Sequence, residues 1–90
     1  MNTRFWEDLG ETGVKILLAI YELGPGKPAY ALDIMVRARI GKTAWYRVLP
    51  VLTKYGLCIV EERPYRLMLT EKGKRVAGLL SEIDRISTQS

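Results

Sequence analysis

The sequence predicts one α+β domain with three helices, then a β-hairpin, then a final helix. Its 90 residues suit a single domain, and 48% apolar with 27% charged residues is a globular composition. Apolar residues recur three and four positions apart in the helical segments, whereas residues 57–69 are rich in β-forming types. Glycine and proline separate these segments, which places the turns.

The first helix is expected to begin near Glu11 and Thr12, with Thr12 as N-cap, after an N-terminal extension of residues 1–11. It runs through VKILLAIYEL and ends at Gly24-Pro25-Gly26, because a glycine cap followed by proline prevents continuation. Apolar side chains cover most of its circumference. We therefore expect it to be covered on more than one side.

A second, short helix should follow Pro28 and cover AYALDIMVR, with Ala31, Ile34 and Met35 facing inward. A third helix begins at about Lys42 and ends at Gly56. The connection between them is three to five residues long, contains glycine, and holds one apolar residue, Ile40. That composition is typical of a helix-turn-helix.

The third helix has two unlike faces. The apolar residues fall three or four apart and should form the buried face: Trp45, Val48, Leu49 and Leu52. The opposite face presents Thr43, Tyr46, Arg47 and Lys54 to water. Pro50 lies in the middle, where it removes a backbone hydrogen bond and is expected to kink the helix.

Two β-rich runs, Leu57–Glu61 and Tyr65–Leu69, are interrupted by a turn at Arg63-Pro64. A tight loop predicts the cross-strand pairs Cys58 with Leu69 and Val60 with Leu67 on the inner face, and Ile59 with Met68 and Glu61 with Arg66 on the outer face. The single cysteine, Cys58, is then a small core residue.

Thr70 is the expected N-cap of the last helix, EKGKRVAGLLSEIDRI, which fades into the tail STQS. A domain of this size covers Val76 and Leu80 with its own core, but not the apolar residues beyond them. The expected dimerisation residues are Leu79, Ile83 and Ile86, with Phe5, Trp6 and Leu9 as their covering, from the same chain or, as we favour, from a two-fold mate. Gly78 would permit close backbone approach at that interface.

Charge is concentrated in the middle of the chain. No acid occurs between Asp33 and Glu61, and residues 27–75 carry a net charge of +7 while the two ends together carry −3. A basic middle with acidic flanks indicates one surface directed at a polyanion.

The composition also argues against several functions. Without histidine and with one cysteine, the chain offers no disulfide framework, and zinc or Cys-His chemistry is not expected. We expect no enzyme, no metal and no cofactor. No apolar run reaches the ~18–20 residues of a membrane span. The opening MNTRFWEDLG is not a secretory signal, so a cytoplasmic protein without membrane contact is expected.

Two blocks resemble winged helix-turn-helix proteins of the MarR and PadR kind, particularly small archaeal members. They are TAWYRVLPVLTKYGL, for the recognition helix and first wing strand, and YRLMLTEKGKRV, for the second wing strand and last helix. The likeness covers roughly residues 12–80. Leu49, Leu52 and Gly56-Leu57 match a leucine pair followed by Gly-Leu, and residues 69–73 match the strand-to-helix junction. The short turn at Arg63-Pro64 and the proline inside the helix depart from the pattern.

The resemblance implies a winged helix-turn-helix domain over residues 12–75, with a three-helix core and a two-stranded wing. It also implies a dimer, which the apolar residues of the last helix place at residues 76–90. The partner would be double-stranded DNA, bound by a homodimeric transcription regulator with helix 42–55 in the major groove. The alternatives are a sequence-indifferent architectural DNA-binding protein and a winged-helix protein-protein adaptor.

Arg47 is the candidate for bidentate contact with guanine, against the alternatives of a phosphate contact or a solvated side chain. Lys42 and Thr43 suit phosphate at the helix start. Tyr46 is assigned to a sugar or a thymine methyl, or else to packing on the second helix. The remaining candidate DNA contacts are Arg37 and Arg39, which also offset a helix dipole, Lys54, and Arg63 and Arg66 on the wing, where Arg66 has Glu61 as an alternative partner.

Overall fold

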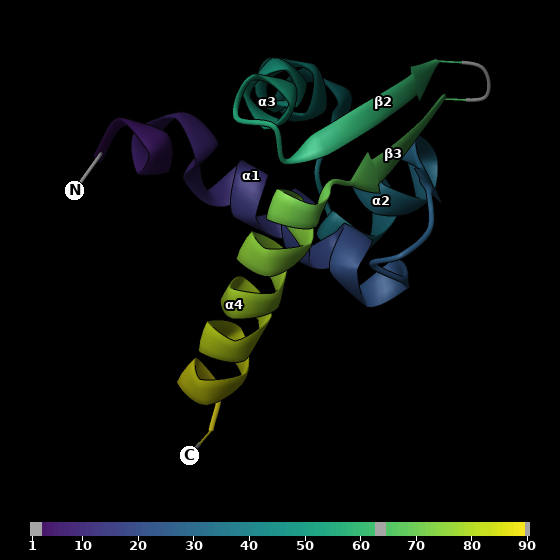
Figure 1. The fold of residues 1–90 in the computed structure, drawn as a ribbon. Coiled ribbons are helices and arrows are strands. Elements are labelled where there is room, and N and C mark those ends of the chain that lie inside the picture. Colours follow the sequence, from purple (N-terminus) through teal and green to yellow (C-terminus); the bar gives the residue numbers. More distant parts are fainter. Residues whose placement is uncertain (1–2, 63–64, 90) are drawn as a thin grey trace.

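The computed structural model describes residues 3–62 and 65–89 (Figure 1). The element order is helix, strand, two helices, two strands and a last helix, which confirms the predicted α+β class. The elements are α1 (Thr3–Leu23), β1 (Ala29–Tyr30), α2 (Ala31–Ala38), α3 (Lys42–Lys54), β2 (Cys58–Glu62), β3 (Tyr65–Leu69) and α4 (Glu71–Ser87).

Helix α1 is the centre of the core. Ile16, Leu17 and Ile20 are fully buried, and α1 packs against α2, α3, α4 and β3 (Figure 1). The prediction that other elements pack on more than one side of this helix is confirmed, and those elements belong to the same chain. Each fully buried side chain of this size stabilises the fold by about 1.5–3 kcal/mol relative to an exposed one.

The predicted helix start near Glu11 coincides with a break in α1 at Gly10, and the N-terminal extension before that break is itself helical from Thr3. Helix α1 begins at Thr3 and is divided by Gly10, whose φ of 59° and ψ of −174° are non-helical. Glycine adopts a positive φ without steric cost, so the chain changes direction there. Residues 3–9 form an additional helical segment, because Leu9 enters the core, where it is only 1% exposed.

The predicted second helix starts two residues too early. Ala29 and Tyr30 form strand β1, which pairs antiparallel with β3 through Ala29–Leu67 and Tyr30–Arg66. The sheet therefore has three strands in the order β1-β3-β2, rather than the two expected of the wing. This pairing joins residues far apart in the chain, so local periodicity does not reveal it. Ala31 and Ile34 of α2 are buried, as predicted.

The hairpin register is confirmed. The pairs are Cys58–Leu69, Ile59–Met68, Val60–Leu67 and Glu61–Arg66, with Glu62–Tyr65 closing the ladder. Residues of the inner face pack on the helices, and burial raises the pKa of the Cys58 thiol to about 12, so this cysteine stays protonated. The turn residues Arg63 and Pro64 lie outside the described residues.

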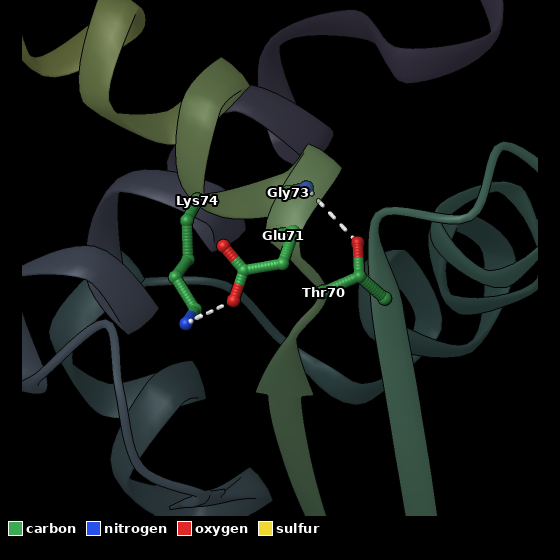
Figure 2. Close-up of polar contacts among 4 residues, drawn as sticks. All are labelled: Thr70, Glu71, Gly73 and Lys74. Atoms are coloured by element: carbon green, nitrogen blue, oxygen red, sulfur yellow. Dashed lines mark hydrogen bonds and ion pairs between the residues drawn. The ribbon is translucent and has the colours of Figure 1, made fainter.

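Helix α4 starts as predicted, with Thr70 as its N-cap. The Thr70 hydroxyl accepts a hydrogen bond from the Gly73 backbone N–H at 3.0 Å, and Lys74 pairs with Glu71 at 2.8 Å (Figure 2). The hydrogen bond from Lys74 lowers the pKa of the Glu71 carboxyl. A Cβ at Gly73 would lie 2.0 Å from the Leu57 carbonyl oxygen, so only glycine allows α4 to approach the backbone just before β2 this closely.

Gly78 does not serve the interface for which it was proposed. A Cβ placed there would lie 3.4 Å from the Tyr21 hydroxyl of α1, so the small residue faces its own domain.

In the described ranges, 3–62 and 65–89, none of the helices has the length and apolar character needed to cross a bilayer.

Candidate nucleic-acid interface

One face of α3 is fixed to the domain. Trp45 and Leu52 are completely buried, Val48 is nearly so, and Leu49 is partly buried against the same core. These positions confirm the predicted inner face. Tight packing of a rigid aromatic side chain holds the helix in one orientation, so the outer face is held rigid for contact with a ligand.

The outer face of α3 is exposed along its length, at Thr43, Tyr46, Arg47, Pro50 and Lys54. Pro50 lies on this side and does not end the helix, which runs on to Lys54. The Thr53 hydroxyl donates to the Pro50 carbonyl at 3.0 Å. Pro50 has no N–H to donate to the Tyr46 carbonyl, but both residues are exposed, so water can reach that carbonyl.

The turn before α3 is tight. Arg39 adopts the left-handed conformation, with φ 57° and ψ 49°, and its N–H and that of Ile40 donate to the carbonyls of Val36 and Met35. Glycine is the usual residue in this conformation, yet the glycine of the turn, Gly41, is the extended N-cap of α3 instead. This geometry places Lys42 in the first helical turn.

The start of α3 is suited to an anion. Its first turn contains no acid, and the N-cap Gly41 has no side chain to satisfy the free backbone N–H groups. Those groups and the positive end of the helix dipole favour negative charge. Lys42 and Thr43 are exposed beside them. A phosphate oxygen is the natural ligand for such a set.

Three predicted DNA contacts have partners within the chain. Arg37 pairs with Glu22 of α1 at 3.1 Å, and Arg66 pairs with Glu61 at 2.8 Å and lies 5.9 Å from the Tyr30 ring. The Lys54 ammonium lies 5.5 Å from the centre of the Tyr55 ring. The Glu61 pairing is the structural alternative considered for Arg66. Arg63 falls outside the described residues.

The other predicted contacts remain available. The side chains without a hydrogen bond or ion pair to any described residue include Arg39, Lys42, Thr43, Tyr46 and Arg47, all of them exposed. The outer face of α3 thus presents two cations, Lys42 and Arg47, and two side chains that can donate and accept hydrogen bonds, Thr43 and Tyr46. Arg39 of the preceding turn lines a hollow with residues of α1 and α4, among them Glu22 and Asp84.

An acidic segment beside α3 was not anticipated. Arg47 shares an open cavity of about 510 Å³ with Glu7, Asp8 and Glu11 of α1. The Tyr55 hydroxyl at the end of α3 donates to the Asp8 carboxylate at 2.8 Å, and this hydrogen bond raises the Tyr55 pKa. The negative charge of the N-terminal end was visible in the sequence, but its place beside α3 follows from the bend at Gly10.

The predicted dimerisation residues need one correction. Leu9 is covered by its own chain and is not available to a partner. Phe5 and Trp6 lie beside α4 of the same chain, where they line a groove together with Val76, Leu79, Leu80 and Ile83. Their cover of α4 is incomplete, because Trp6, Leu79, Ile83 and Ile86 remain 48–63% exposed.

No family model and no curated protein matches the chain. Among solved structures, the chain is similar to NadR in complex with 4-hydroxyphenylacetate, with a TM-score of 0.69 and 22% sequence identity. The match covers 89% of this chain and 62% of the NadR chain, so this chain spans less than two thirds of that protein. The likeness supports the winged helix-turn-helix fold predicted from the sequence.

Proposed function

We propose that this protein is a homodimeric transcription regulator that binds double-stranded DNA with α3 in the major groove. One observation carries the proposal: α3 is anchored by buried Trp45 while its opposite face and preceding turn present unpaired Arg39, Lys42 and Arg47 to solvent. An α-helix fits the major groove, and a fixed helix holds its side chains in register with base edges.

The roles follow from position. Lys42 and Thr43, at the start of α3, would contact phosphate together with the free backbone N–H groups. Arg47, one turn further along, would pair with guanine, and Tyr46 with a sugar or a thymine methyl. Arg39 adds a phosphate contact from the turn. Arg37, Lys54 and Arg66 are secondary, since their exposed pairings exchange for phosphate at little cost.

The regulator class has independent support from the structural neighbour. NadR is a MarR-family regulator and was crystallised with a small aromatic acid. By this likeness we infer a non-enzymatic, cytoplasmic regulator.

The homodimer would use the apolar surface that the N-terminal segment leaves uncovered on α4. Trp6, Leu79, Ile83 and Ile86 form the contact, with residues 76–90 contributing most of it. Replacing Leu79 and Ile83 by lysine should convert a dimer into a folded monomer, because both side chains are exposed within one chain. Sedimentation equilibrium measures this directly, and Lys72→Glu on the same helix is the charge control.

The DNA-binding proposal is tested by selecting duplexes from a random pool and comparing variants on a selected and a random duplex. Arg47→Ala should weaken the binding free energy by about 1–3 kcal/mol on the selected duplex and change it little on the random one. Lys42→Ala should weaken both alike and reduce the salt slope by about 1. Lys72→Ala, with the same charge change at an exposed position of α4 outside residues 76–90, should alter neither.

Other outcomes favour the alternatives. Equal losses for Arg47→Ala on both duplexes, with no sequence enriched in the selection, indicate an architectural DNA-binding protein. Affinity that disappears for every duplex at physiological salt indicates a protein-protein adaptor, because generic basic surfaces bind DNA only weakly there.

A further inference from the structure

The outer face of α2 carries an apolar ridge with no cover. Leu32 and Val36, one helical turn apart, are 67% and 70% exposed, the highest values among the large apolar side chains of residues 3–62 and 65–89. With Leu23 of α1 they line a groove of about 360 Å³, with Asp33 and Arg37 also contributing. Exposed apolar surface of this kind marks an interaction site.

This ridge is separate from the proposed α4 dimer surface. Figure 1 places α2 on the side of the domain opposite the N-terminal helical segment, which contributes Trp6 to that surface. A second copy bound at α2 would therefore leave the α4 surface accessible. Two different self-association faces on one chain link copies into rows, because contact through one face leaves the other free.

The charges beside the ridge complement a second copy of the same helix. Asp33 and Arg37 follow Leu32 and Val36 by one position each, so both lie on the same flank of the ridge. When two such helices pack antiparallel about a two-fold axis, equal flanks meet, and Asp33 of each copy faces Arg37 of the other. Arg37 uses its Nε–H for Glu22, which leaves its terminal N–H groups for this contact.

The size of the surface sets its strength. Eight residues of helix span only about 12 Å, so the contact is far smaller than the ~800 Å² per partner of a stable interface. Such a contact is weak between free molecules. It becomes effective when another interaction holds the copies side by side at high local concentration.

We propose that the Leu32–Val36 ridge is a second self-association surface, through which neighbouring molecules on DNA contact each other by an antiparallel α2–α2 pairing. This proposal rests on the proposed DNA binding. Its consequence is cooperative occupation of long DNA, with an affinity gain of about ten-fold over a duplex that holds one dimer.

The experiment compares duplexes of about 20 and about 80 base pairs, since two half-sites one turn apart occupy roughly the shorter length. The wild-type chain should bind the longer duplex cooperatively. Leu32→Gln/Val36→Gln should lose the ten-fold gain and keep its affinity for the short duplex, because both side chains are exposed. Asp33→Arg and Arg37→Asp should each reduce the ratio of long- to short-duplex affinity, and the double variant should restore it.

The outcomes separate this inference from the proposed function. An unchanged ratio in Leu32→Gln/Val36→Gln overturns it, and failure of the double charge variant to restore the ratio overturns the two-fold pairing. Absence of binding to both duplexes rejects the proposed function. Sedimentation at millimolar protein then decides, with Leu79 and Ile83 both replaced by lysine so that the α4 surface cannot contribute: a self-association of that chain that is insensitive to Leu32→Gln/Val36→Gln, or no self-association at all, overturns the α2 surface.

Discussion

Helices α3 and α4 are both anchored on one side and exposed on the other, but their exposed faces differ. The outer face of α3 carries Lys42, Thr43 and Arg47, whereas that of α4 carries Leu79 and Ile83. The hydrophobic effect stabilises any association that removes apolar surface from water, and it does not depend on the orientation of the groups. Cations and hydroxyls instead bind an anion through hydrogen bonds that require defined positions. The difference suggests a polar ligand for α3 and a protein partner for α4.

The anchors differ as well. Helix α3 is anchored by the large, fully buried Trp45. The start of α4 lies directly against the Leu57 backbone, which is possible because Gly73 has no side chain. A large core residue stabilises by the surface it buries, and a glycine by the backbone approach it permits. Substitutions at the two anchors should therefore act by opposite physical causes, a cavity in one case and a clash in the other.

The largest expected effect is at the anchor of α3. Trp45→Ala should lower the free energy of unfolding by about 3–5 kcal/mol, because it leaves a cavity under the helix. The matched control is Trp6→Ala, which removes a half-exposed indole and should lower it by about 1 kcal/mol within one chain. Urea denaturation at a concentration where the chain is monomeric measures both. Equal losses would show that the two tryptophans are equivalent anchors.

The second largest effect on the free energy of unfolding is expected at Gly73, the anchor of α4. Gly73→Ala should destabilise by about 3 kcal/mol, because its methyl group would overlap the Leu57 carbonyl. Gly78→Ala, on the same helix, meets Tyr21 only at contact distance and should stabilise by roughly 0.5 kcal/mol through helix propensity. Thermal unfolding of the two variants checks the contrast. A mild effect at Gly73 would mean that α4 can shift away from β2.

The turn that leads into α3 offers a smaller, stabilising change. Arg39→Gly should raise the free energy of unfolding by about 0.5 kcal/mol, because glycine adopts the left-handed conformation without strain. Arg39→Ala deletes the same cation and keeps the strain, so it should not stabilise. Both variants should bind DNA less tightly by a similar factor. If only one of them loses affinity, the turn conformation rather than the charge is responsible.

The smallest expected effect on stability is at Tyr55, at the end of α3. The neutral Tyr55 phenol donates to Asp8, and this hydrogen bond raises its pKa above the ordinary value of 10.0. Its stabilisation is therefore present below pH 10 and lost as pH rises through the folded-state pKa. Tyr55→Phe should unfold at a slightly lower temperature than wild type at pH 7, and the difference should shrink as the pH is raised above 10 and through the folded-state pKa. A difference that does not change with pH would contradict the role given to the Tyr55–Asp8 hydrogen bond.

Much of the fold was predictable from local patterns. The inner face of α3, the Thr70 cap and the hairpin register each depend on residues close in the chain, and all three predictions are confirmed. The exposed face of α3 could be predicted for the same reason, because burial of Trp45 and Leu52 leaves Tyr46 and Arg47 outside.

The errors share one cause. Strand β1 exists because Ala29 and Tyr30 meet β3, and the N-terminal helical segment exists because Leu9 enters the core. The exposed Leu32 and Val36 and the acids beside Arg47 likewise follow from how distant segments pack. Contacts between distant segments leave no periodic signal in either one.

Spacing, capping and charge along the chain were thus enough to specify the element types, the hairpin register and the cationic outer face of α3, since each depends on interactions within a few residues or one tight turn. Long-range packing set the third strand, the bend at Gly10 and the pairing of Arg37 with Glu22. The physical reason is that burial and ion pairing depend on distance in space, and the chain order alone does not specify that distance.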